Sequence, residues 1–226
     1  MPARSISLSV IIPTLNASRT LSATLVAVGD GDEIVVVDGG STDNTIELAT
    51  AHGARVVQSS AGRGQQLIAG AGAVRSDWFM FLHADTVLAA GWREEVHEFQ
   101  ENPENATRAA TFRFELDDEC AEARRLERLV AWRVRSIGLP FGDQGLVIHR
   151  QFYWSLGGYR PWPLMEDVDL VRRVGRRRLA IFHSAARTSA ERWRRDGWHR
   201  RSLRNLSCLG LYFLGVPPQL IWKLYD

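Results

Sequence analysis

The feature that most constrains the fold is a regular alternation of short apolar runs and helix-forming stretches in the first ninety residues. The apolar runs cover residues 8–12, 34–37, 55–58 and 78–82, and the helical stretches cover 19–28, 44–52 and 65–74. The last of these runs is apolar on both faces, which is typical of a strand buried inside a parallel sheet. The order therefore predicts an α/β fold, with a mostly parallel sheet flanked by helices and right-handed crossovers.

Beyond residue 90 the pattern is less regular. Helices are expected at 92–101, 120–136, 151–156 and 167–178, and strands at 109–116, 146–149 and 179–183. A basic helix at 193–205 precedes an apolar run, 206–222, which is interrupted by Gly215 and a pair of prolines. That run is short for a membrane-spanning helix. We expect docked C-terminal helices, with a peripheral membrane contact or a homodimer contact as alternatives.

The formal charge of +2 hides an uneven distribution, because residues 171–226 carry 13 basic and 3 acidic side chains. Such a segment could attract a diphosphate, an anionic membrane or a nucleic acid. The chain contains no base-reading motif, so we expect no nucleic-acid partner. Cys120 and Cys208 lack metal-ligand spacing, which favours reduced thiols. The N-terminus lacks a long apolar signal segment. These features predict a cytoplasmic protein, with a peripheral position at the inner membrane surface as the alternative.

Polar side chains follow three of the predicted strands at the point where each ends. They are Thr14, Asn16, Asp38, His83 and Asp85. Ligands of parallel α/β sheets bind at the carboxyl ends of the strands. The sequence therefore predicts one binding site at this edge.

Asp38 and the small residues after it suit a nucleotide. A flat ring can lie against a backbone that carries small side chains, while the carboxylate accepts hydrogen bonds from a base or from ribose hydroxyls. The same segment is also explained by a tight turn in which Asp43 caps the next helix.

His83 and Asp85 suit a metal ion that accompanies a diphosphate. A divalent cation needs a hard oxygen ligand at that edge, and phosphate oxygens and water can complete its shell. Asp85 offers that oxygen, although it could instead cap a helix. His83 could orient Asp85, contact the nucleotide or lie in the core.

A third group of acids stands at the predicted start of the 167–178 helix. The helix dipole alone would favour Glu166, Asp167 and Asp169 there. Displacement of a nucleoside diphosphate by a hydroxyl also needs a base, and a carboxylate in this position is a candidate. The loop 142–145 offers Asp143 and Gln144 to sugar or acceptor hydroxyls, unless it is a plain turn.

Taken together, these segments resemble the family 2 glycosyltransferases, which have the GT-A fold. The similarity lies in SVIIPTLN at 9–16, VDGGSTDNT at 37–45, LHADT at 82–86 and MEDVDL at 165–170. A small soluble subgroup is more similar still, through GDQG at 142–145 and the stretch from Thr188 to Trp193. The resemblance implies an inverting transferase that moves a sugar from a nucleotide-diphosphate donor to an acceptor hydroxyl.

Position by position, the resemblance also implies roles. Asp167 is the expected catalytic base, positioned by Glu166. The expected donor-binding residues are Pro13, Thr14, Asn16, Asp38, Arg63, His83, Ala84 and Asp85. The expected acceptor-binding residues are Gly142, Asp143, Gln144, Arg192 and Trp193. Asp85 would hold Mg²⁺ or Mn²⁺, and His183, at the end of the last strand, is a candidate further ligand.

The resemblance further implies a single domain over residues 1–226. Residues 1–90 would form the nucleotide-binding half, 91–190 the acceptor half and 191–226 the C-terminal helices. A UDP- or GDP-sugar is the expected donor. The acceptor is not determined, and a lipid-linked one would suit the Trp-rich end. Three positions depart from the family pattern, namely Gly39 and His83 in place of Asp, and Ile68 in place of Asn.

Other functions compete with this interpretation. A sugar-nucleotide nucleotidyltransferase would have a Gly-rich segment with a lysine after the first strand, but Lys223 is the only lysine of the chain. A dinucleotide-dependent oxidoreductase would need G-x-G-x-x-G after a strand. A catalytically inactive relative that serves as a binding module stays open, although Asp85 and Asp167 are both present.

Overall fold

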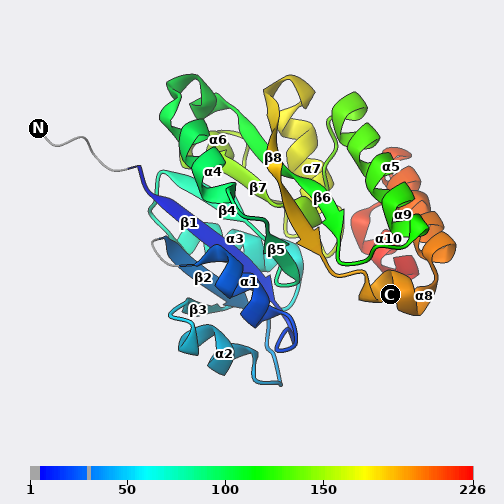
Figure 1. Cartoon of the computed structure of the whole chain (residues 1–226), viewed down its shortest axis with the longest axis horizontal. Coiled ribbons are helices and arrows are strands. Elements are labelled where there is room, and N and C mark those ends of the chain that lie inside the picture. Colours follow the sequence, from blue (N-terminus) through cyan, green and yellow to red (C-terminus); the bar gives the residue numbers. More distant parts are fainter. Residues whose placement is uncertain (1–5, 30–31, 226) are drawn as a thin grey trace, which may run out of the picture.

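A sheet of eight strands runs through the computed structural model, which describes residues 6–29 and 32–225 (Figure 1). The strands are β1 (Leu8–Thr14), β2 (Glu33–Asp38), β3 (Arg55–Gln58), β4 (Trp78–Phe81), β5 (Thr86–Leu88), β6 (Ala109–Leu116), β7 (Leu146–His149) and β8 (Leu179–Thr188). Their order in the sheet is β3-β2-β1-β4-β7-β6-β8-β5. The first four strands are parallel, as predicted. The second half is mixed, because β7 is antiparallel to β4 and β6, and β5 is antiparallel to β8.

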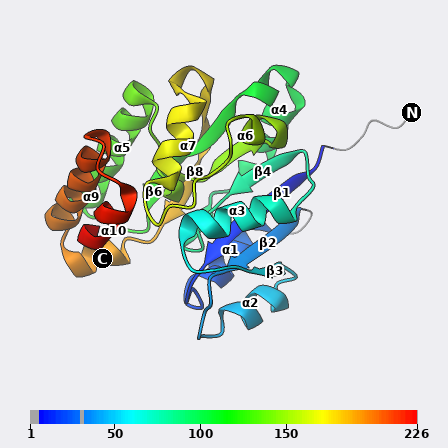
Figure 2. The same cartoon turned by 180° about the vertical axis from the view of Figure 1, so that it is seen from behind.

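Helices cover both faces of this sheet. They are α1 (Leu21–Val28), α2 (Thr45–Ala51), α3 (Arg63–Ala73), α4 (Trp92–Glu101), α5 (Ala121–Ile137), α6 (Arg150–Ser155), α7 (Glu166–Val174), α8 (Glu191–Asp196), α9 (Trp198–Phe213) and α10 (Pro218–Tyr225). Val10 and Ile12 of β1 face the core under α1 and α4, whereas Ile11 faces the core under α3, α6 and α7. Figures 1 and 2 show these two helical layers from opposite sides. Because successive side chains of a strand point to opposite faces, a doubly covered strand must be apolar throughout.

Four features differ from the pattern expected from the sequence. The helix expected at 167–178 ends at Val174, and Arg176–Arg178 form a separate 3-10 helix. The short strand β5 was not predicted, because three residues are too few to display a period. Strand β8 continues to Thr188 instead of ending at His183. The basic helix is divided into α8 and α9 at Gly197, whose φ of 85° is a left-handed conformation that glycine adopts without strain.

The C-terminal helices dock on the protein, as expected. Cys208 of α9 and Ile221 of α10 are buried in the core that contains α7. Other side chains of these helices are exposed, among them Leu206, Leu214 and Leu224. Within the described part of the chain, none of the helices has the length and apolar character needed to cross a membrane. The cytoplasmic location, the peripheral membrane contact and the homodimer stay predictions. The expectation of a missing signal segment falls partly on residues 1–5, outside the described residues.

Two glycines of α3 differ in how closely they approach the sheet. A Cβ atom added at Gly70 would lie 2.4 Å from Ile11 Cγ2 and 2.9 Å from Val37 Cγ2, whereas one added at Gly72 would have no neighbour within 4 Å. We expect Gly70→Ala to lower the free energy of unfolding by about 1–3 kcal/mol through overpacking. Gly72→Ala should raise it by about 0.5–1 kcal/mol through helix propensity. Urea denaturation measures both, and shifts of the same sign would contradict this packing.

Candidate active site

The polar residues that follow the parallel strands separate into two groups, and the first is a pair of interlocked loops. Asp38 is 1% exposed and its carboxylate accepts hydrogen bonds from the backbone of Gly40 (2.9 Å) and Ser41 (2.8 Å) and from the hydroxyls of Ser41 and Thr14. Burial raises the pKa of Asp38, but these bonds outweigh burial and hold the pKa below its ordinary value. This carboxylate therefore shapes its own loop, and its expected contact with a nucleotide stays a prediction.

Asn16 and Asp43 join the loop after β1 to the loop after β2. The Asn16 side-chain oxygen accepts from Thr42 N at 2.8 Å, and Asn16 has a φ of 50°. Asp43 accepts from Ser18 N (3.1 Å) and from Thr45 N (3.1 Å), in the first turn of α2. Hydrogen bonds from Thr45 and Ser18 lower the pKa of Asp43 to about 2. The helix N-cap is Asn44, one residue later than expected, but Asp43 accepts from the first amide of α2 and links this helix start to the neighbouring loop.

The departure of this chain at Gly39 has a packing reason. The buried Gln66 of α3 donates to the carbonyl oxygens of Thr14 (2.6 Å) and Val37 (2.8 Å), which fastens α3 to the ends of β1 and β2. A Cβ atom at Gly39 would lie 3.1 Å from the Gln66 amide carbon. An aspartate at this position would press on Gln66. Pro13 lies beside these residues in β1, where it pairs with Val37.

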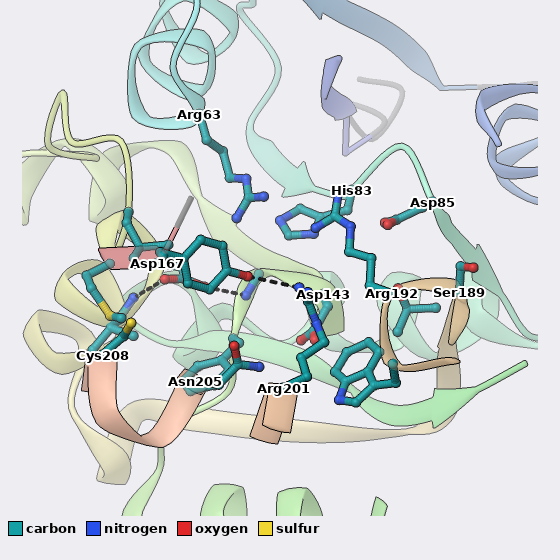
Figure 3. Close-up of a pocket in the computed structure, with 18 residues that line it drawn as sticks. Arg63, His83, Asp85, Asp143, Asp167, Ser189, Arg192, Arg201, Asn205 and Cys208 are labelled. Carbon is teal, nitrogen blue, oxygen red and sulfur yellow. Dashed lines mark hydrogen bonds between the residues drawn. The ribbon is translucent and has the colours of Figure 1, made fainter. Parts of the chain in front are cut away.

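The second group forms a cavity, in which eight of the predicted site residues meet (Figure 3). They are Arg63, His83, Asp85, Gly142, Asp143, Asp167, Arg192 and Trp193. Asp85 and Asp167, the expected metal ligand and the expected base, therefore share one cavity. Asp38 does not line it.

Asp167 is held at the start of α7 by backbone groups. Its Oδ2 atom accepts from Gly142 N at 2.7 Å, and its Oδ1 atom accepts from Val168 N at 2.7 Å. Met165, two residues before Asp167, is the helix N-cap and has a φ of 67°, an unusual conformation for a side chain of this size. Backbone amides thus orient both oxygens of this carboxylate.

Gly142 brings the 142–145 loop close to two other site residues. A Cβ atom at this position would lie 2.5 Å from His83 Nε2 and 3.4 Å from Asp167 Oδ2. No larger residue fits without moving the imidazole. The close approach places the Gly142 amide beside the Asp167 carboxylate.

Glu166 lies behind Asp167 and is completely buried. Both of its carboxylate oxygens lack a hydrogen-bond partner among the described residues, and Arg63 NH1 lies 3.7 Å from Oε1. Burial raises the pKa of Glu166 to about 7, the charge of Asp167 adds to this, and Arg63 opposes it. Burial lowers the pKa of Arg63, but Glu166 and Asp167 raise it overall. Glu166 thus exchanges a proton near neutrality, and Arg63 stays charged.

His83 and Asp85 lie on the turn between β4 and β5. In this position the His83 side chain is desolvated and faces the charges of Arg63 and Arg192. Both effects hold the pKa of His83 well below its ordinary value, so its imidazole is neutral at pH 7. Asp85 leads into β5 and caps no helix. The carbonyl of Ala84 accepts from Thr24 of α1 at 3.0 Å, which anchors the turn from outside the cavity.

The two polar residues of the 142–145 loop have different roles. Burial raises the pKa of Asp143 to about 6, and Arg133 opposes this. Gln144 is 1% exposed, donates to Phe112 O at 3.0 Å and does not line the cavity. Gln144 therefore anchors the loop on β6, and its expected contact with an acceptor stays a prediction.

His183 is also absent from the cavity. It was expected at the end of the last strand, but β8 continues for five residues beyond it, to Thr188. The His183 side chain is exposed, and its backbone N–H donates to Glu95 of α4. The end of β8 reaches the cavity instead through Thr188 and the following Ser189, and a metal-binding role of His183 stays a prediction.

Several cavity residues were not predicted, and four of them come from the C-terminal helices. Arg201, Asn205 and Cys208 of α9 line the cavity, as does Tyr225 of α10. Arg201, Asn205 and Cys208 are spaced i, i+4 and i+7, which places them on one face of a helix. That spacing was available in the sequence.

The side chains of the cavity offer few ligands for a metal ion. Within residues 6–29 and 32–225, no three His, Cys, Asp or Glu side chains are grouped so that they could hold a metal by themselves. Asp85 nevertheless lines the cavity beside arginines. Magnesium-type cations are commonly held by one or two carboxylates plus phosphate oxygens and water. The residues therefore fit a cation that binds together with a phosphorylated ligand.

Comparison with known sequences gives a consistent result. Residues 9–153 match the family model described as glycosyl transferase family 2. An uncharacterized glycosyltransferase of Mycobacterium tuberculosis is 36% identical over 86 residues, which are 38% of this chain and 39% of that protein. Glucosyl-3-phosphoglycerate synthase of the same species is 33% identical over 95 residues, 36% of this chain and 29% of the synthase. The chain thus matches well under half the length of these relatives.

Solved structures extend the likeness to the fold of nearly the whole chain. Glucosyl-3-phosphoglycerate synthase of M. tuberculosis, solved with Mn²⁺, UDP and glucosyl-3-phosphoglycerate, has a TM-score of 0.60 and 22% identity, covering 93% of this chain and 81% of that one. TarS of S. aureus, residues 1–349, has a TM-score of 0.66 and 13% identity, covering 97% and 69%. The mixed sheet and its helical layers are therefore those of GT-A glycosyltransferases. Since the family model spans more than half of its length, this chain belongs to glycosyltransferase family 2.

Proposed function

We propose that the protein transfers a sugar, with inversion, from a nucleoside-diphosphate donor to an acceptor hydroxyl, and that a divalent cation assists. The observation that carries the proposal is the presence of Asp85 and Asp167 in one cavity, in different surroundings. Asp85 stands on the turn after β4 beside arginine side chains, whereas Asp167 is fixed at a helix start by two amides. Two carboxylates with separate tasks are what a metal-assisted displacement needs.

On the donor side, Asp85 would hold Mg²⁺ or Mn²⁺. The bound cation would neutralise charge on the departing diphosphate. Arg63 and Arg192 also line the cavity and offer permanent charge and planar donors to phosphate oxygens. The Mn²⁺ and UDP-glucose bound by the M. tuberculosis synthase support a UDP-sugar as the donor.

Thr14, Asn16 and Asp38 would serve the donor indirectly. Their side chains satisfy one another and the loop backbone, so they hold the surface on which a nucleotide would lie. Base recognition would then depend on the backbone and on the small side chains of the loop. This assigns a shaping role to the Asp38 carboxylate.

On the acceptor side, Asp167 would take the proton of the attacking hydroxyl. An amide binds each of its oxygens, and each oxygen keeps lone pairs for a further partner. Glu166 would support this base by remaining protonated or paired with Arg63, since two adjacent buried charges repel. The family match favours this function over a nucleotidyltransferase. An inactive binding module is the outcome that the following experiments would reveal.

Asp167→Asn tests the proposed base. The amide keeps the size of the side chain and loses its basicity, so we expect transfer to fall by about 10²–10⁴-fold. The affinity for UDP with Mn²⁺, measured by calorimetry, should change less than threefold. Wild-type transfer rates in this variant would remove Asp167 from the mechanism.

Asp85→Ala tests the proposed metal ligand. We expect the variant to lose nearly all activity and to bind UDP equally with and without Mn²⁺, because the protein oxygen that holds the cation is gone. Glu98→Ala is the control, since Glu98 is an exposed carboxylate on α4. Mn²⁺-dependent UDP binding that survives in Asp85→Ala would exclude this ligand role.

The buried Glu166 predicts a pH dependence of stability. Its pKa is about 7 in the folded protein against an ordinary value of 4.5, so the folded state binds the proton more tightly. The resulting stabilisation is complete below about pH 4.5 and is lost as the pH rises through 7. Between these values we expect the free energy of unfolding to decline, by up to about 3 kcal/mol for this group.

Glu166→Gln should make that decline shallower, because an amide does not titrate. Urea denaturation at pH 4.5, 6 and 7.5 measures the slope in the wild type, in Glu166→Gln and in the exposed control Glu98→Gln. Asp143, also raised to about 6, leaves a residual slope. Equal slopes in all three proteins would show that Glu166 is ionised throughout.

A further inference from the structure

The cavity contains an unusual number of buried polar atoms that the protein leaves without a partner. Four of its lining residues have such an atom among the described residues: Asp143 Oδ1, Trp193 Nε1, Arg201 Nε and Asn205 Oδ1. Native proteins leave few buried polar atoms unpaired, because each one has lost its hydrogen bonds to water without replacement. Their concentration around one cavity indicates that a ligand completes them.

These atoms come from parts of the chain that are far apart in sequence. Asp143 belongs to the loop before β7, Trp193 to α8, and Arg201 and Asn205 to α9. Figure 3 shows Arg201 and Asn205 on the side of the cavity away from Arg63. Three of the four lie beyond residue 153, where the family match ends. This wall is therefore a feature that the C-terminal helices add.

The surrounding structure holds two of these side chains, Arg201 and Trp193, in place. Arg201 is 4% exposed, and its NH1 and NH2 atoms donate to Asp196 (2.8 Å) and to the Tyr225 hydroxyl (3.0 Å). The Trp193 ring stacks on Trp198 at 6.4 Å, with the Arg201 guanidinium 5.2 Å from its centroid. A group that is fixed and unpaired is preorganised for an external partner.

The chemistry of the four atoms restricts what the partner can be. Trp193 Nε1 and Arg201 Nε are donors, whereas the Asn205 oxygen, and Asp143 Oδ1 when ionised, are acceptors. A hydroxyl both donates and accepts, so a compound with several hydroxyls satisfies both kinds. A phosphate or carboxylate only accepts, and would leave Asn205 unpaired and lie near the Asp143 carboxylate. An alkyl chain satisfies none of them.

Charge and ring surfaces agree with a neutral partner. Three arginines line the cavity, Arg63, Arg192 and Arg201, and so do three aspartates, so the wall has no large excess of either sign. Phe141, Trp193 and Tyr225 also line it. Aromatic rings offer an apolar surface to the C–H faces of a sugar ring.

We propose that this wall is the acceptor subsite and that it takes a small neutral polyhydroxy compound, a sugar or polyol, whose hydroxyls pair with Asp143, Trp193, Arg201 and Asn205. The proposal rests on the proposed glycosyl transfer and specifies its acceptor class. The subsite adjoins the base, because the residue before Asp143 donates its amide to Asp167. A lipid-linked acceptor, which the Trp-rich end of the sequence had suggested, does not match these groups.

The experiment is a direct binding measurement, so it does not depend on turnover. Saturation-transfer NMR of the full chain, with and without UDP and Mn²⁺, uses four probes: D-glucose, myo-inositol, 3-phosphoglycerate and 1-octanol. We expect saturable binding of glucose or inositol and at least tenfold weaker binding of the two other probes. Preference for 3-phosphoglycerate or 1-octanol, or no binding of either neutral polyol, would overturn the proposal.

Two tryptophans provide a matched pair of variants. Trp193→Phe and Trp198→Phe each remove one indole N–H from the same stack, but only Trp193 lines the cavity. We expect polyol binding to weaken at least tenfold in Trp193→Phe and less than twofold in Trp198→Phe. Equal effects in the two variants would contradict a direct contact.

Asn205→Leu separates a ligand role from a structural one. A buried acceptor without a partner destabilises the protein, so its removal should raise the Tm by about 2–4 °C. The same change should abolish polyol binding, because the acceptor for a ligand hydroxyl is gone. A structural asparagine would instead lower the Tm when replaced, and that result would overturn the assignment. If polyols bind as expected but UDP-glucose is never consumed, the proposed transfer fails and the subsite stands.

Discussion

The site depends on how the fold accommodates two adjacent carboxylates at one buried helix start. Glu166 and Asp167 cannot both ionise there without compensation, because like charges in a low-dielectric setting repel. The structure treats them differently. Asp167 receives two backbone amides, whereas Glu166 receives only the more distant charge of Arg63 and a pKa near neutrality. Three residues with unusual backbone positions surround this pair of carboxylates. Met165 has a positive φ at the helix start, and Gly142 lies against Asp167. Gly64, next to Arg63, packs directly on the backbone of residues 160–162.

The loops around Asp38 and the cavity around Asp143 and Asn205 differ in how many of their polar atoms have a hydrogen-bond partner. Around Asp38 the carboxylate, the Thr14 hydroxyl and the Asn16 side-chain oxygen all take part in hydrogen bonds within and between the loops. Around Asp143 and Asn205, several buried atoms have no partner. A surface whose polar atoms are already hydrogen-bonded can position a ligand through its shape. A surface with unpaired polar atoms can recognise a ligand through specific hydrogen bonds.

The mixed half of the sheet brings the C-terminus into the site. Because β5 pairs with β8, Asp85 at the start of β5 lies near Ser189 at the end of β8. The chain then continues directly into α8 and α9, which supply Trp193, Arg201 and Asn205. A three-residue strand thus brings Asp85 and the C-terminal helices to the same cavity.

The sequence by itself determined the α/β class, the parallel half of the sheet and the candidate roles of Asp85 and Asp167, because strand burial and strand-end chemistry are written in local patterns of a few residues. It also identified the family, since four short motifs occur in the right order. Only the tertiary structure decided that the side chains of Asp38 and Gln144 form hydrogen bonds within the protein. It also decided that His183 lies outside the cavity, whereas Arg201 and Asn205 line it. Those outcomes depend on which distant side chains meet, and pairing across strands and helices is set by packing of the whole chain, which no local pattern contains.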